Sequence, residues 1–153
     1  MYDIIIIGAG PAGISAALYA KRANSNVLVI NHGKTSLEGA EKIENYYGFP
    51  GGISGKDLYE NGIKQAEKLG IEIKKIEVIQ IENIGNTFNV KTEDGDFMTK
   101  AIILSTGNKK LSPDIKGVKE FEGKGISYCA ICDAFFYRGK NVAVIGNRKI
   151  CSK

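Results

Sequence analysis

The sequence predicts a three-layer α/β fold with a mostly parallel sheet, helices packed against that sheet, and an added β-hairpin. Residues 2–7 and 27–30 are short apolar runs rich in β-branched side chains, which is typical of strands buried on both faces. A glycine-rich turn and a helix-like stretch separate these runs, so they form a β-α-β unit. Asp94-Gly95 lies between two further strand-like runs, and this dipeptide is a strong hairpin signal.

The other elements of the first part of the chain follow from local patterns. We expect a helix over residues 14–22, which Asn24–Asn26 would end. Residues 31–55 are rich in Gly, Ser and Asn and show no clear period, and a loop of this length is usually functional. An amphipathic helix is expected over residues 56–69. Its predicted core contacts are Leu58, Ile63, Ala66 and Leu69.

The hairpin region completes this part of the fold. Residues 71–84 alternate well enough for one or two strands. Residues 87–92 and 97–104 are the two strands expected on either side of the Asp94-Gly95 turn. Ser105-Thr106-Gly107 follows directly and closes the unit.

A second domain is expected to begin after a connector. Residues 108–125 contain Ser-Pro and several glycines and are interpreted as that connector. Residues 141–145 resemble a new buried strand, which would open a second nucleotide-binding unit. We therefore predict a nucleotide-binding domain over residues 1–111 and the start of another over residues 112–153.

Composition and charge exclude several classes of protein. Hydrophobic residues make up 43% of the chain and charged residues 25%, which is ordinary for a globular protein. The net charge is only +4 and the basic residues are scattered, so we expect no nucleic-acid partner. No apolar run is long enough to span a bilayer and no signal peptide is evident. A cytoplasmic location is therefore predicted, where thiols are kept reduced.

The glycine-rich turn indicates dinucleotide binding. Gly8 permits a tight turn, Gly10 lets a pyrophosphate approach the backbone, and Gly13 lets the helix pack closely on the sheet. The helix N-terminus offers free N–H groups and a positive dipole end to the phosphates. A purely structural strand-to-helix turn is the alternative, which three correctly spaced glycines disfavour. The candidate phosphate-binding residues are Gly8, Gly10, Pro11, Ala12 and Gly13.

The end of the second strand lacks the acidic residue that usually contacts the ribose. Asn31 occupies this region, and its side chain can still hydrogen-bond a ribose hydroxyl, so we keep it as a candidate. His32 is the only histidine in the chain. We interpret it as a surface or loop residue rather than a catalytic one.

A Cys-x-x-Cys-Asp segment predicts thiol–disulphide chemistry. The spacing lets the sulfurs of Cys129 and Cys132 form a disulphide, and motifs with this spacing commonly have one thiol with a lowered pKa. The carboxyl group of Asp133 could shuttle a proton during exchange. Half of a zinc site is the alternative, but only Cys151 and His32 remain as ligands, at the wrong spacing. Cys151 is interpreted as an incidental thiol.

Four segments together resemble one known family. The chain is similar to bacterial low-molecular-weight thioredoxin reductases and clostridial relatives, within the class II pyridine nucleotide-disulphide oxidoreductases. The resemblance covers residues 1 to about 147. The matching segments are residues 7–13, 43–50 (Ile-Glu-Asn-Tyr-Tyr-Gly-Phe-Pro), 105–107 and 127–137 (Ser-Tyr-Cys-Ala-Ile-Cys-Asp-Ala-Phe-Phe-Tyr).

The resemblance implies a Rossmann-like FAD-binding fold and a flavin-dependent mechanism. A pyridine nucleotide (NADPH or NADH) or another donor reduces the bound FAD, which passes two electrons to the Cys disulphide and on to a thioredoxin-like protein. By position, Cys132 resembles the charge-transfer thiol next to the flavin, and Cys129 the interchange thiol that attacks the partner. Asp133 resembles the acid–base residue. The full-length family forms homodimers.

Further cofactor contacts are implied in the same way. Asn45 lies in the segment that matches the family's flavin-contacting loop, and Thr106 and Gly107 lie in the turn that lines the cofactor. Val78 falls in the strand that usually touches the adenine, although a core Val is an equally good interpretation. Gly146-Asn147-Arg148 replaces the run of glycines that the family has before its second helix.

The family's chains are considerably longer than this one. We therefore expect a truncated N-terminal half, whose C-terminus results from a frameshift or an equivalent interruption of a longer gene. Two hypotheses stay open: an FAD-dependent disulphide reductase, or a non-catalytic fragment of such an enzyme. The flavin colour of the purified protein would distinguish them.

Overall fold

A computed structural model of the chain divides it into two compact units, Met1–Lys109 and Lys110–Lys153. The structure describes residues 1–33, 35–37, 39–108, 114–122, 124–129 and 133–145.

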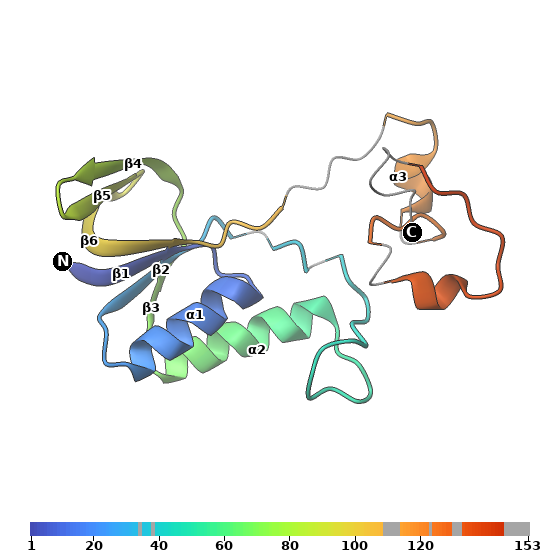
Figure 1. Cartoon of the computed structure of the whole chain (residues 1–153), viewed down its shortest axis with the longest axis horizontal. Coiled ribbons are helices and arrows are strands. Elements are labelled where there is room, and N and C mark those ends of the chain that lie inside the picture. Colours follow the sequence, from blue (N-terminus) through green and yellow to red (C-terminus); the bar gives the residue numbers. More distant parts are fainter. Residues whose placement is uncertain (34, 38, 109–113, 123, 130–132, 146–153) are drawn as a thin grey trace. The chain divides into compact units, whose positions relative to one another are not determined.

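The first unit is an α/β sandwich built on a mixed sheet of six described strands (Figure 1). The strand order is β3-β2-β1-β6-β5-β4. Strands β3, β2, β1 and β6 run parallel, and β6, β5 and β4 form an antiparallel meander. The predicted α/β class and hairpin are confirmed. The elements are β1 (Tyr2–Ile7), α1 (Pro11–Arg22), β2 (Val27–Ile30), α2 (Gly55–Lys68), β3 (Glu72–Lys74), β4 (Val78–Ile84), β5 (Thr87–Thr92) and β6 (Gly95–Leu104).

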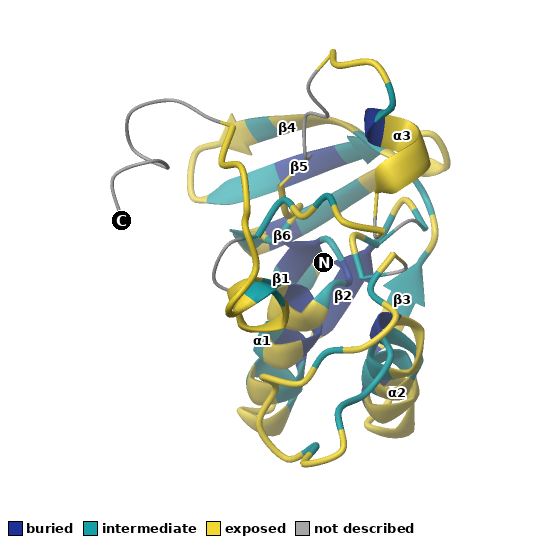
Figure 2. Ribbon diagram, turned by 90° about the vertical axis from the view of Figure 1, so that its right-hand side faces the viewer, coloured by how far each residue is buried: buried dark blue, intermediate teal, exposed yellow. Residues whose placement is uncertain are grey.

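Strand β2 and the second half of β1 are buried on both faces, as their composition predicted, whereas the first three residues of β1 are partly buried (Figure 2). Because side chains alternate along a strand, Ile6 packs on the helix side of the sheet, whereas Ile5 and Ile7 face the opposite side. The helix-side core includes Ala17 of α1 and Ala66 of α2. The opposite core is completed from the meander, by Val90 of β5 and partly buried Phe97 of β6.

Both helices lie within a few residues of their predicted bounds. Helix α1 begins at Pro11 rather than at residue 14, because proline suits the first helical position, where its missing N–H is not needed. Helix α2 is capped by Ser54, whose Oγ accepts a hydrogen bond of 3.0 Å from the Asp57 N–H. The prediction that Leu69 contacts the core is wrong, because Leu69 follows the last helical turn and its side chain is exposed.

Strand β6 joins the meander to the parallel sheet. Its first residues pair with β5 and its last residues pair with β1. Thr99 pairs with both neighbours and is fully buried, and its Oγ donates to the Ala101 carbonyl at 2.9 Å. Because β1, β2 and β6 are parallel, the residues that follow them meet at one edge of the sheet.

The second unit contains two short helices among its described residues, α3 (Val118–Phe121) and the 3₁₀ helix η1 (Ala134–Tyr137). The prediction of a buried strand over residues 141–145 is wrong. These residues have no regular structure, and Val142 and Val144 are exposed. The physical reason is that a strand needs a neighbour to accept its hydrogen bonds, and none of the described strands pairs with this segment. No helix in the described parts of the chain has the length and apolarity to cross a membrane.

A hydrogen bond between the ends of β1 and β3 makes a pH-dependent contribution to stability. The Tyr2 hydroxyl donates to Glu72 Oε2 at 2.7 Å. Burial and this carboxylate raise the pKa of Tyr2 to about 12, and the hydroxyl lowers the pKa of Glu72. The contribution of the Glu72 carboxylate to stability is therefore present above its pKa in the unfolded chain, and it is lost as pH falls through its lower pKa in the folded protein. The hydroxyl's contribution is present below its unfolded pKa and lost as pH rises toward 12.

We expect Tyr2→Phe to lower the free energy of unfolding by about 0.5–1 kcal/mol at neutral pH, since one partly exposed hydrogen bond is lost. Urea unfolding at several pH values measures the difference. The difference should shrink in acid, where Glu72 becomes protonated in both states. Tyr47→Phe is the control, because Tyr47 is 98% exposed. A difference that stayed constant into acid would contradict the assigned role of Glu72.

Candidate functional site

The glycine-rich turn lies at the carboxyl edge of the parallel sheet and is tied to both neighbouring strands. The Gly8 N–H donates to the Ile30 carbonyl of β2 at 2.8 Å. From the other side, the Ser105 N–H donates to the Ile7 carbonyl at 2.8 Å. This edge, beyond the carboxyl ends of the strands, is where open α/β sheets bind their ligands.

Two of the glycines are required by close packing. Gly8 has a φ of +109°, and a Cβ there would overlap the Ser105 carbonyl. A Cβ on Gly13 would overlap the Gly8 carbonyl oxygen and lie 2.5 Å from the Ser105 Oγ. Ser105 therefore fills the space under the turn, and its Oγ donates toward the Gly8 and Ile7 carbonyls at 2.8 and 3.0 Å.

The third glycine leaves space for a ligand. A Cβ on Gly10 would meet nothing within 4 Å. Gly10 is the N-cap of α1, no side chain caps this helix, and its first turn carries no acidic residue. Pro11 and Ala12 of that turn are exposed. The positive end of the helix dipole thus faces open space, which fits a phosphate group.

A groove of about 170 Å³ begins at this turn. Gly10 and Pro11 line one end of it, and Tyr46 and Phe49 of the long loop line another part. Tyr59 of α2 contributes a phenol ring to the wall. The groove is therefore formed by α1, α2 and the segment before α2, all within the first unit.

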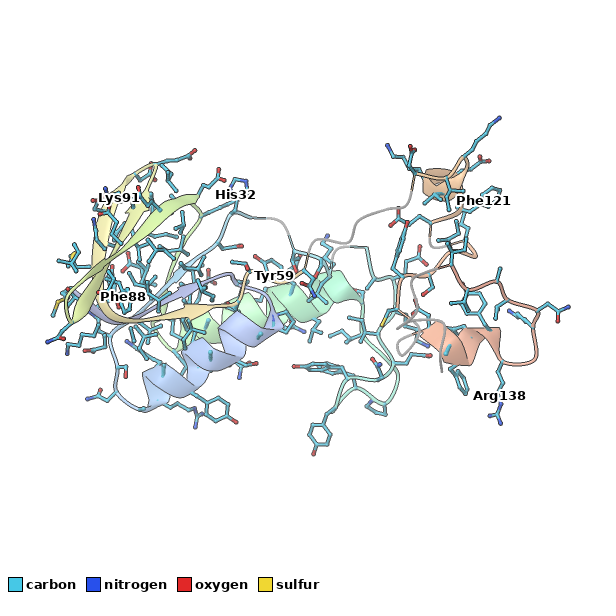
Figure 3. The ribbon with its side chains drawn as sticks, turned by 45° about the horizontal axis from the view of Figure 1, so that its top comes forward. His32, Tyr59, Phe88, Lys91, Phe121 and Arg138 are labelled. Atoms are coloured by element: carbon cyan, nitrogen blue, oxygen red, sulfur yellow. The ribbon has the colours of Figure 1, made fainter. Side chains whose placement is uncertain are left out.

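Asn31 directly follows β2 and lies beside the turn. Its N–H donates to the Lys74 carbonyl at 2.9 Å, and its Nδ2 donates to the Tyr59 Oη at 2.8 Å. His32 lies on the surface, as expected: its ring is 73% exposed and 3.8 Å from the Glu77 carboxylate. Figure 3 shows Tyr59 on α2 and His32 in the loop after β2.

The sheet edge brings together part of the predicted cofactor set. Residues 8–13 and Asn31 meet there, and Thr106 and Gly107 follow Ser105 in an exposed segment. Asn45 is exposed in the loop before α2. Val78 begins β4 and is partly buried against the core cluster on the face opposite the helices.

The second unit holds the described part of the Cys-x-x-Cys-Asp segment. Cys129 is disulphide-bonded. Its N–H donates to the Ser127 Oγ at 3.1 Å, and its carbonyl accepts from the Asp133 N–H at 3.0 Å. The Ser127 hydroxyl donates to the Asp133 carboxylate. Cys132 and Gly146-Asn147-Arg148 lie outside the described residues.

Ser127 is a further candidate site residue that the sequence reasoning missed. It holds the Asp133 carboxylate and also closes a turn onto the backbone of Cys129. The hydroxyl oxygen of a Ser often accepts a hydrogen bond from the backbone N–H two residues later in the chain, and this local pattern could have identified Ser127. Within the described ranges, no group of three His, Cys, Asp or Glu side chains is arranged to hold a metal ion.

Comparison with protein families decides the classification. Residues 2–148 match the family described as pyridine nucleotide-disulphide oxidoreductase. The chain belongs to this family. The match includes the glycine-rich turn, the carboxyl ends of β2 and β6, and the Cys-x-x-Cys-Asp segment.

Similar proteins and structures agree with this family. The chain is 45% identical to a thioredoxin reductase of Treponema pallidum over 95% of its length, and 42% identical to one of Aquifex aeolicus over 96%. The crystal structure of thioredoxin reductase from Streptococcus pyogenes matches 90% of this chain, with 40% identity and a TM-score of 0.82. The chain covers 48%, 46% and 45% of these three proteins, so it spans about half their length.

Proposed function

We propose that this chain supplies the FAD-binding turn and the redox-active cysteines of an oxidoreductase that reduces a thioredoxin-like protein disulphide. The observation that carries the proposal is the open space at Gly10, in front of an uncapped helix N-terminus. The relatives named thioredoxin reductase support the choice of partner. NADPH or NADH is the proposed electron donor.

The residues of the first unit would hold the cofactor. The N-terminus of α1 and the backbone of residues 8–13 would face the pyrophosphate, and Asn31 the adenosine ribose. FAD, when bound, supplies two-electron transfer between a hydride donor and a disulphide. Asn45, Thr106, Gly107 and Val78 are proposed as further contacts on the strength of the family resemblance.

The residues of the second unit would perform thiol–disulphide exchange. In the reduced protein, the Cys129 thiolate attacks one sulfur of the partner's disulphide and releases the other as a thiolate. Asp133 takes the proton of the Cys129 thiol as the thiolate forms and gives it to that leaving thiolate, and the Ser127 hydroxyl keeps the carboxylate beside the Cys129 turn. The Cys132 thiolate then attacks the Cys129 sulfur, which forms the intramolecular disulphide and releases the partner's second sulfur as a thiolate, and this thiolate takes up the proton that the Cys132 thiol gave up.

We expect the whole chain to bind FAD, and Gly10→Ala to weaken binding at least about tenfold, because the methyl group would occupy the space of the pyrophosphate. Titration of the purified chain with FAD, followed by flavin fluorescence, measures both affinities. The substitution removes a good N-cap residue, so the free energy of unfolding should fall by less than about 1 kcal/mol.

A change at another open glycine provides the control. Gly39→Ala also places a Cβ where nothing lies within 4 Å, and it should leave FAD affinity unchanged. A folded wild-type chain that binds no FAD would contradict the proposal, and so would equal affinities for wild type and Gly10→Ala.

A further inference from the structure

Among the described residues, one side chain holds the Asn31 amide by a hydrogen bond. The Asn31 Nδ2 donates to the Tyr59 Oη at 2.8 Å. Among the described residues, the Asn31 Oδ1 has no hydrogen-bond partner, and the side chain is partly exposed. The terminal torsion of an asparagine is soft, so without a partner its oxygen and nitrogen exchange places easily. The Tyr59 hydroxyl therefore holds the amide in place through its Nδ2, and the Oδ1 is left to accept a hydrogen bond from another donor.

Tyr59 is itself held in place by α2. Its ring is partly buried and packs against the helix-side core. The same ring lines the groove that contains Gly10 and Pro11. The hydroxyl thus reaches Asn31 from a rigid helix rather than from a loop, and its position is fixed by packing that Asn31 does not provide.

The amide lies one strand away from the proposed phosphate position. Ile30 pairs with Ile7, so Asn31 follows β2 where Gly8 follows β1. The Gly8 N–H also donates to the Ile30 carbonyl, which holds the two strand ends together. In a dinucleotide bound with its pyrophosphate at the turn, the adenosine ribose reaches the end of the second strand.

We propose that Tyr59 is a positioning residue that holds the Asn31 amide in place, so that its Oδ1 accepts a hydrogen bond from the vicinal diol of the adenosine ribose. The inference rests on the proposed FAD site and adds a specificity determinant to it. A ribose hydroxyl donates to the Oδ1, as it would to the carboxylate usual at this point, but without a negative charge. A deoxyribose leaves the Oδ1 without that donor, and such loss of a hydrogen bond is what makes a site discriminate.

The test uses ADP as the probe, because it carries the adenosine ribose and the pyrophosphate of FAD. Calorimetric titration of the whole chain compares ADP with 2′-deoxy-ADP and 3′-deoxy-ADP. The wild type should prefer ADP over at least one deoxy analogue by about three- to tenfold, the value of one hydrogen bond. Tyr59→Phe keeps the ring in the core and removes only the hydroxyl. This substitution should weaken the binding of ADP by a similar factor. It should also bring the ratio of the affinities for ADP and deoxy-ADP close to one.

The effects of the Asn31 and Tyr59 substitutions on ADP affinity should not add, and this non-additivity distinguishes a positioning role from a merely structural one. Asn31→Ala alone should abolish the discrimination, and adding Tyr59→Phe to it should cause no further loss of ADP affinity. Tyr19→Phe is the matched control, since Tyr19 lies on α1 and is 79% exposed. It should leave the affinity ratio unchanged.

The outcomes separate this inference from the proposed function. If wild type binds FAD and ADP but Tyr59→Phe keeps the wild-type discrimination, the role of Tyr59 is overturned and the FAD site stands. If the effects of the Tyr59 and Asn31 substitutions simply add, the positioning role is likewise overturned. If the folded wild type binds neither FAD nor ADP, the proposed function fails and the inference fails with it.

Discussion

Gly13→Ala is expected to destabilise the first unit by about 2–4 kcal/mol, because the new methyl group would overlap backbone that cannot move. The overlap is with the Gly8 carbonyl oxygen, and the Ser105 Oγ would lie only 2.5 Å away. Gly8 is tied to β2 and Ser105 to β1 by hydrogen bonds of 2.8 Å. Relief therefore requires α1 to separate from the sheet, which exposes Ile14 and Ala17 of the helix-side core.

Urea unfolding followed by circular dichroism measures this effect. Gly51→Ala is the matched control: the chemical change is the same, but a Cβ there meets nothing within 4 Å. It should unfold within about 0.5 kcal/mol of wild type, as surface substitutions usually do. Equal unfolding midpoints for Gly13→Ala and wild type would show that the turn is not packed as described.

The glycine positions could be predicted from the sequence because their role depends on local order. A buried β1 followed at once by Gly-x-Gly-x-x-Gly places the turn at the strand end and the third glycine inside the first helical turn. Strands β1 and β2 were equally predictable, since burial on both faces produces uninterrupted apolar runs. These features need no knowledge of distant residues.

The features that could not be predicted from the sequence depend on residues that are distant along the chain. Residues 141–145 have the composition of a buried strand, but strand formation depends on partner strands that local sequence does not specify. The Asn31–Tyr59 contact joins residues 28 positions apart, and the side chain of Tyr59 carries no pattern that indicates its partner. The role of Ser127 depends on a six-residue return of the chain to Asp133. Each requires tertiary geometry.

Cys129→Ser is expected to abolish reversible disulphide formation in the second unit and to leave FAD binding by the first unit intact. The structure gives a disulphide-bonded Cys129, and we propose Cys132 as its partner. The chain contains 3 cysteines, so the oxidised wild type should show one reactive thiol when denatured, and all three after reduction with dithiothreitol. Thiol titration of the denatured chain measures these numbers.

Variants at the other cysteines identify the partner. Because the chain has 3 cysteines, Cys129→Ser and Cys132→Ser should each show two reactive thiols before and after reduction, since neither retains the pair. Cys151→Ser should show none before reduction and two afterwards, because its pair is intact. Both variants of the pair should also lose the complete exchange reaction with an oxidised thioredoxin-like protein, down to the rate seen without added chain, because Cys129 makes the first attack and Cys132 is needed to release the partner. If Cys132→Ser showed no free thiol before reduction, Cys129 would be paired with Cys151 instead, and the proposed redox pair would have to be abandoned.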